Sequence, residues 1–149
     1  MTVPVLSVRN LEVEFLTRRS ALRAINGVSF DIAKGEVLGV VGESGAGKSV
    51  TGLAVIGLID PPGRIAGGEI YLSGTRIDHL PPEEIRRIRG KRIGMIFQDP
   101  LTSLNPLYRI GDQIVETIKT HSNLSDTAAR KRAIDLLADK LDRLVVKLK

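Results

Sequence analysis

The sequence contains no cysteine and no tryptophan, and aromatic residues make up only 3% of its 149 residues. Without cysteine the chain can form no disulfide, no thiolate-held iron–sulfur cluster, no zinc site of the cysteine type and no thiol nucleophile. The same absence favours a reducing compartment. Hydrophobic residues (42%) and charged residues (26%) occur in the proportions of an ordinary soluble protein, which excludes a collagen-like or disordered chain. The length suits one domain.

Long hydrophobic runs are also missing. The longest uncharged apolar stretch, Val50–Ile59, is half as long as a membrane-spanning helix, which needs about 20 apolar residues. The first residues, Met1–Val5, lack the basic segment and apolar run of a secretory signal. We therefore expect a chain that neither crosses a membrane nor is exported.

The net charge of +5 and the isoelectric point near 9.8 permit attraction to nucleic acid or to an anionic membrane surface. A charge of this size is also common for solubility, so it identifies no partner. One cluster is strongly basic, but no aromatic residues are interleaved with it, and we interpret it as a solvated helix face. Its members are Arg86, Arg87, Arg89, Lys91 and Arg92.

Residues from Leu6 to Ile32 alternate between apolar and polar, which predicts two half-buried antiparallel strands joined by a polar turn at Thr17–Ser20. One face of the first strand would carry Leu11, Val13 and Phe15, and the opposite face Glu12 and Glu14.

The continuous apolar run Val37–Val41 predicts a strand buried on both faces. From Lys48 the apolar spacing becomes helical through Ile59, and we expect Asp60–Gly63 to end that helix. Further strands are expected at Gly68–Leu72 and Ile93–Gln98, and further helices from Pro82, over Ile110–Ile118 and over Ser125–Lys149. The fold class expected from these elements is α/β.

Residues Gly42–Ser49 read GESGAGKS and match the phosphate-binding pattern G-x-x-x-x-G-K-[ST] in full, between a predicted strand and a predicted helix. Glycines let successive backbone N–H groups converge on phosphate oxygens, and the helix start adds unpaired amides and its positive dipole end. Lys48 can reach the β and γ phosphates, and the Ser49 hydroxyl can be a ligand of Mg²⁺. The alternative, a glycine-rich turn that matches by chance, fits the flanking elements poorly.

We therefore expect this segment to bind nucleotide phosphates and Mg²⁺, with Lys48 acting in catalysis and Ser49 at the metal; the resemblance described below implies ATP as the nucleotide. The expected nucleotide-binding residues of this segment are Gly42, Glu43, Ser44, Gly45, Ala46, Gly47, Lys48, Ser49 and Val50.

Two residues outside the loop have open interpretations. Gln98 ends a predicted strand, so its amide oxygen could reach Mg²⁺ or an attacking water, or it could be a solvated strand end. Phe15 could stack on a purine base or could belong to the core.

Together these residues resemble the nucleotide-binding subunits of ABC transporters, specifically the importers of peptides and nickel. The resemblance covers roughly Leu6 to Asp135. It rests on Leu6–Leu11 (LSVRNL), Gly42–Ser49, Gly67–Ile70 (GGEI) and Arg92–Pro106 (RIGMIFQDPLTSLNP). The last run is the most specific, because in the family it forms the Q-loop, which joins the ATP core to a helical subdomain and touches the membrane-spanning partner.

The resemblance implies a P-loop NTPase core with an N-terminal antiparallel β subdomain and the beginning of a helical subdomain, in truncated form. It divides this partial nucleotide-binding domain into a β subdomain and P-loop core at 1–100, and a Q-loop with the start of the helical subdomain and an atypical last helix at 101–149. It also implies a metal-binding, catalytic and coupling role for Gln98 and an adenine-stacking role for Phe15.

The resemblance further implies an ATPase that couples ATP binding and hydrolysis to the import of peptides or nickel. Its partners would be membrane-spanning permease subunits and a second nucleotide-binding subunit, with no nucleic acid expected, and its place the cytoplasmic face of the inner membrane. The family's later L-S-G-G-Q signature, its Asp-Glu strand and its switch histidine do not occur in the 149 residues. We therefore expect this chain alone not to be hydrolytically competent.

Two alternatives remain at this point. The first is a nucleotide-binding or interaction protein that hydrolyses nothing and docks a partner through the apolar stripe of its last helix. That stripe consists of Ile134, Leu137, Leu141 and Leu144. The second is an ABC-type ATPase of DNA repair or translation, which the high isoelectric point favours and the Q-loop run opposes.

Overall fold

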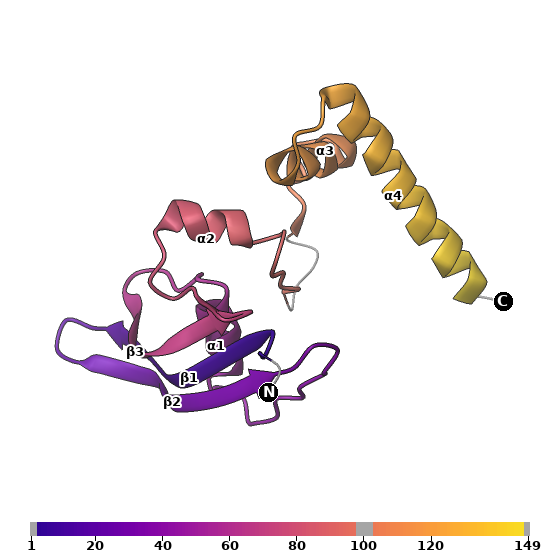
Figure 1. The fold of residues 1–149 in the computed structure, drawn as a ribbon. Coiled ribbons are helices and arrows are strands. Elements are labelled where there is room, and N and C mark those ends of the chain that lie inside the picture. Colours follow the sequence, from indigo (N-terminus) through magenta and orange to yellow (C-terminus); the bar gives the residue numbers. More distant parts are fainter. Residues whose placement is uncertain (1–2, 98–102, 148–149) are drawn as a thin grey trace. The chain divides into compact units, whose positions relative to one another are not determined.

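The first part of the chain contains a four-stranded antiparallel sheet (Figure 1). The computed structural model describes residues 3–97 and 103–147, and the chain divides into two units, residues 1–95 and 96–149. The sheet has the order β2-β1-β3-β4. Its strands are β1 (Leu6–Leu16), β2 (Ala21–Ile32), β3 (Gly63–Leu72) and β4 (Thr75–Arg76).

The predicted pair of N-terminal strands is confirmed, since β1 and β2 pair from Leu6 opposite Ile32 to Leu16 opposite Ala21. The turn between them is closed by the Thr17 amide and hydroxyl, which donate to the carbonyl of Ser20 at 2.8 and 2.6 Å. The strand predicted at Gly68–Leu72 is also confirmed, although β3 begins earlier, at Gly63.

Strand β1 departs from strict alternation, because its register shifts between Val8 and Leu11 and again between Val13 and Glu14. Val8, Leu11 and Val13 all lie in the core. Glu14 lies between Val13 and Phe15 in a stretch that pairs regularly with β3, yet it is only 8% exposed, and its carboxylate forms an ion pair with Arg64 at 2.6 Å. Arg64 stands directly opposite Glu14 on β3 and compensates the burial of this carboxylate.

The core of this unit lies between the sheet and the helices α1 (Lys48–Val55) and α2 (Pro82–Ile88). Its fully buried side chains include Leu11 and Ile70 from the sheet, and α1 contributes Ala54 and Val55. The helix predicted to open at Pro82 is confirmed.

Helix α1 is shorter than predicted, because it does not continue through Ile59. Gly57 has a φ of +66°, its amide donates to Ala54 O at 3.0 Å, and the amide of Leu58 donates to Leu53 O at 2.8 Å. This pair of bonds is the Schellman arrangement that ends helices at a left-handed glycine. The glycine, and not the proline pair that follows, therefore ends α1.

Two predicted strands are wrong. Residues Val37–Val41 have no regular secondary structure, and Val37 and Val41 are 94% and 97% exposed. In the second predicted strand, Ile93 forms one isolated bridge with Arg89 and residues 94–97 are irregular. A strand needs a hydrogen-bonding neighbour, and no strand within residues 3–97 and 103–147 pairs with either segment.

The second unit contains the helices α3 (Ile110–His121) and α4 (Asp126–Lys147), and both predicted helices are confirmed. They pack through Val115 of α3 and Ala129 and Ala133 of α4. Ile134 and Leu137 of the predicted stripe do not supply this contact, since they are 66% and 45% exposed, and the side chains of Leu141 and Leu144 lie outside the described residues. The small alanines supply it, because they let two helices approach closely. Within the described residues, no helix is both long and apolar enough to span a membrane.

Candidate functional site

The GESGAGKS segment forms an exposed loop that leads directly into α1. Gly45 and Gly47 both have a φ of +83°, and the Ala46 amide donates to Glu43 O at 3.2 Å to form a turn. At Gly47 a Cβ would lie 2.5 Å from Cδ1 of Ile25 and 3.0 Å from the carbonyl oxygen of Ala24. Only glycine meets both the dihedral angle and this close approach, so the start of α1 lies tightly against β2.

The amino-terminal end of α1 is open to an anion. Gly47 is its N-cap residue, no side chain caps the helix, and its first turn contains no acidic residue. The first intrahelical bond runs from the Thr51 amide to Gly47 O at 2.8 Å. The amides of Lys48, Ser49 and Val50 precede that bond and have no intrahelical acceptor, so they supply donors and the positive end of the helix dipole.

Lys48 spans the loop. Its ammonium donates to the carbonyl oxygens of Gly42 and Glu43, both at 2.6 Å. A Cβ at Gly42 would stand 3.3 Å from Cβ of Ala46, which is a tight contact, and 3.9 Å from Nζ of Lys48, which is an ordinary one. The positive charge of Lys48 is thus held on carbonyls of the same loop that leads into the uncapped start of α1.

The other predicted loop residues differ in what they offer. Glu43, Ser44 and Ser49 are exposed. Val50 packs its side chain against the core, so only its backbone amide is available to a ligand. The structure therefore brings the predicted residues from Gly42 to Val50 together around one helix end.

Phe15 lies on β1, two residues after Val13, whose partner Ile25 contacts the Gly47 position. Its side chain is half-buried and packs against the core, and Cε1 of the ring is 2.7 Å from where a Cβ of Gly63 would stand. The Phe15 ring therefore covers Gly63 of β3. Only the exposed part of the ring could stack on a nucleotide base.

Gln98 lies outside the described residues. The segment before it passes α1, because the methyl group of Met95 lies 3.4 Å from the position of a Cβ at Gly52. Within residues 3–97 and 103–147, no three histidine or acidic side chains are grouped to hold a metal ion.

A cavity of about 340 Å³ adjoins the loop. Apolar side chains line most of it, among them Phe30, Val40 and Val55, and Lys48 is its one charged lining residue. A phosphate group would lose its hydration against such walls, so we place the anion at the loop amides and not in this cavity.

Arg89 was missed as a contact residue, because the basic cluster was interpreted as a solvated helix face. That interpretation is wrong for Arg89, which is half-buried and donates Nε to Ile56 O at 2.7 Å and Nη2 to Gly57 O. Arg86 and Arg87 are exposed, as expected. A glycine that ends a helix in the left-handed conformation indicates that carbonyl groups at the helix end need a donor. Nothing in the sequence shows which arginine of the cluster supplies it.

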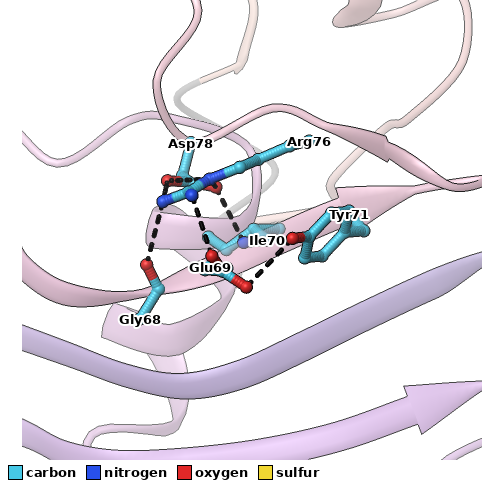
Figure 2. A network of polar contacts seen from close by, with 6 residues as sticks. All are labelled: Gly68, Glu69, Ile70, Tyr71, Arg76 and Asp78. Carbon is cyan, nitrogen blue, oxygen red and sulfur yellow. Dashed lines mark hydrogen bonds and ion pairs between the residues drawn. The ribbon is translucent and has the colours of Figure 1, made fainter.

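A second polar network braces the β3–β4 hairpin (Figure 2). Arg76 pairs with Glu69 at 2.8 Å and with Asp78 at 3.0 Å, and Asp78 also accepts the amide of Ile70 at 2.8 Å. Burial alone would raise the pKa of Asp78, but the hydrogen bonds from Arg76 and Ile70 and the arginine charge outweigh it and lower that pKa. The hydrogen bond that Tyr71 donates to Glu69 raises the tyrosine pKa. These groups satisfy one another, so the network is a brace and not a ligand site.

The chain is similar in sequence to known proteins. The sequence model of the family described as ABC transporter matches residues 25–147. The chain belongs to this family. The oligopeptide transport ATP-binding protein OppD of Bacillus subtilis (strain 168) is 49% identical over 133 residues, 89% of this chain and 37% of that protein. The dipeptide transport ATP-binding protein DppD of Escherichia coli (strain K12) is 46% identical over 132 residues, 89% of this chain and 40% of that protein.

This ABC transporter chain thus spans 37% to 40% of the length of these relatives. A dimeric ATP-binding cassette in a post-hydrolysis state with ADP and phosphate bound matches with a TM-score of 0.71 and 25% identity, over 89% of this chain and 56% of that one. A dimeric structure of a bacterial ABC transporter cassette matches with a TM-score of 0.70 over the same shares. The predicted family and the predicted cassette fold are confirmed.

Proposed function

We propose that the chain is the ATP-binding part of a subunit that powers peptide import. The observation that carries the proposal is the loop before α1, which joins an uncapped helix start at Gly47 to the Lys48 ammonium on the carbonyls of Gly42 and Glu43. Relatives named for oligopeptide and dipeptide transport support the choice of peptides as the transported class.

The residues of the loop divide the work on a bound nucleotide. Loop amides and the start of α1 would hold the phosphates, and Lys48 would turn from the carbonyls of Gly42 and Glu43 to the β and γ oxygens. The exposed Ser49 hydroxyl, one residue into α1, suits a ligand of Mg²⁺, which neutralises phosphate charge when bound. Charge that develops on the phosphoryl group would meet donors already in place.

Two further roles belong to the same proposal. Gln98 would contact the metal and couple the site to a membrane partner, and the exposed part of Phe15 would stack on adenine. Residues 1–100 would form the β subdomain and nucleotide core, and residues 101–149 would begin the helical subdomain.

The assembly we propose contains membrane-spanning permease subunits and a second nucleotide-binding subunit at the cytoplasmic face of the inner membrane. The names of the relatives and the dimeric state of the matching cassettes support it. Because the 149 residues contain neither the signature motif nor the Asp-Glu strand of the family, we propose that this chain binds Mg-ATP and hydrolyses it negligibly.

Nucleotide titration tests the proposal. Titrating the chain with Mg-ADP in a calorimeter should give binding that Lys48→Ala weakens by about tenfold or more, the value of a charge-assisted contact to phosphate. Lys34→Ala is the matched control, because Lys34 lies in the exposed turn after β2 and its substitution removes the same charge. Equal affinity of the wild type and Lys48→Ala, or no binding at all, would contradict the proposal. Steady phosphate release from ATP that disappears in Lys48→Ala would contradict negligible hydrolysis.

The exposure of Ile134 and Leu137 favours a second candidate, an interaction protein that docks through α4. Sedimentation at several concentrations tests self-association through this face. A strictly monomeric chain that Ile134→Ser leaves unchanged would contradict that form of docking.

A further inference from the structure

We infer that Arg89 is a positioning residue for the nucleotide site: its guanidinium holds the carboxyl end of α1, and through that helix it sets the place of Lys48 and the loop amides. The inference rests on the proposed function and adds to it a residue far from the phosphates. Helix α1 runs from the phosphate loop to the carbonyls that Arg89 binds, and at eight residues it is about 12 Å long.

The contacts are specific to the fork of an arginine. Nε donates to Ile56 O at 2.7 Å and Nη2 donates to Gly57 O. Ile56 is the C-cap residue of α1 and Gly57 follows it, so neither carbonyl has an acceptor role within the helix ladder. One side chain therefore satisfies two carbonyls that the Schellman turn leaves open.

Arg89 also places a positive charge at the carboxyl end of α1, which has none of its own. The last turn of α1 contains no basic residue, so the negative end of its dipole is unopposed within the helix. Arg89 supplies that charge from 32 residues further along the chain. The amino-terminal end of the same short helix is the end that faces phosphate.

Arg89 itself is held firmly. Its amide donates to Ile85 O at 3.0 Å, and the loop after it is closed by Gly90 N to Ile93 O at 2.8 Å. Ile85 is buried in the core and Ile93 packs against it. The arginine thus extends from a backbone fixed by the core, unlike its exposed neighbour Arg87.

The same segment contacts α1 a second time, through Met95 over Gly52. Helix α1 is therefore held at Gly47 by β2, at Gly52 by Met95 and at its end by Arg89. Release of the last contact would leave the carboxyl end of α1 held only by the core packing of Ala54 and Val55, so that it could shift about the close approach at Gly47. The loop amides and the Lys48 ammonium would then move relative to one another. Donors that must converge on one phosphate group bind it more weakly when they are misplaced.

The test compares Arg89→Met and Arg89→Lys with Arg87→Met, an exposed arginine on α2 that removes the same charge. Measurements are made on the 149-residue chain at a temperature at which all variants have the wild-type circular dichroism spectrum. We expect the Kd for Mg-ADP to rise about fivefold in Arg89→Met, about twofold in Arg89→Lys, which keeps the charge but not the fork, and not at all in Arg87→Met.

Nitrogen-15 NMR of the chain without nucleotide provides the second readout. The amide resonances of Gly45, Gly47 and Lys48 should shift in Arg89→Met, shift less in Arg89→Lys and stay in place in Arg87→Met. A lower melting temperature with unchanged loop resonances and unchanged Kd would overturn the inference and leave Arg89 a purely structural residue. The NMR readout needs no ligand. A wild type that does not bind Mg-ADP would show that the proposed function fails, whereas the loop resonances test the role of Arg89 independently.

Discussion

Strand β1 and the segment Val37–Val41 are both rich in β-branched and aliphatic residues, yet their surroundings are opposite. In β1, Leu11 and Val13 are fully buried and both edges of the strand are paired, with β2 and with β3. In the other segment, Val37 and Val41 are almost fully exposed and no strand forms. Apolar composition alone does not make a strand, because the backbone donors and acceptors need neighbours and the side chains need a facing layer.

The two glutamates that flank Val13 also differ in burial, and each forms an ion pair with an arginine. Glu14 is buried and is bound by Arg64 at 2.6 Å, whereas Glu12 is 32% exposed at its side chain and lies 3.6 Å from Arg23. Neighbouring residues of one strand thus hold similar pairs in different dielectric surroundings. The buried pair matters more, because loss of one partner leaves an uncompensated charge.

The largest expected effect separates the buried strand from the exposed segment. Leu11→Ala should lower the free energy of unfolding of the sheet unit by about 3 kcal/mol, because it leaves a cavity in a closed core. Val41→Ala, the matched control, should change it by less than about 0.5 kcal/mol. Native-state hydrogen exchange of the β1 amides measures both. Similar costs for the two substitutions would mean that Val41 is buried in solution.

An intermediate effect is expected for the ion pairs. Arg64→Met should destabilise the sheet unit by about 2 kcal/mol, because the Glu14 carboxylate loses its hydrogen bond and its ion pair with Arg64 while it stays buried. Arg23→Met should cost less than about 0.5 kcal/mol, since its pair with Glu12 is exposed. The same exchange measurement applies, and equal effects would remove the distinction between the two pairs.

The smallest expected effect concerns acid. The pKa of Asp78 is lower in the folded chain than its ordinary value of 3.8, so its carboxylate stabilises the fold above pH 3.8, and this contribution is lost as the pH falls through the folded pKa. Between pH 6 and pH 2, wild type should lose about 1 kcal/mol more stability than Asp78→Asn, which keeps an acceptor for the Ile70 amide. Urea titrations at both pH values measure this.

Asp126 serves as the control in the acid experiment. A hydrogen bond from Lys119 lowers its pKa, but the side chain is 73% exposed, so Asp126→Asn should flatten the acid dependence less than Asp78→Asn. Equal flattening by the two variants would show that burial in the β3–β4 brace adds nothing.

Sequence reasoning succeeded where one local signal was sufficient. The alternation before Ile32 predicted β1 and β2, Pro82 with two following glutamates predicted α2, and the glycine-rich pattern predicted the loop before α1. It failed where a distant partner decides the outcome. The strand at Val37–Val41 depended on a neighbour, and the burial of Glu14 depended on Arg64, 50 residues away.

The amino-acid sequence by itself predicted the glycine-rich loop before α1, because the glycines, Lys48 and Ser49 lie within eight consecutive residues and their spacing carries the geometry. It also determined the family, through that loop and the run Arg92–Pro106. Only the tertiary structure decided which residues hold the loop in place. Ile25 against Gly47 and Arg89 on the end of α1 are contacts between segments far apart in the chain, and such contacts follow from how the core packs and not from any local pattern.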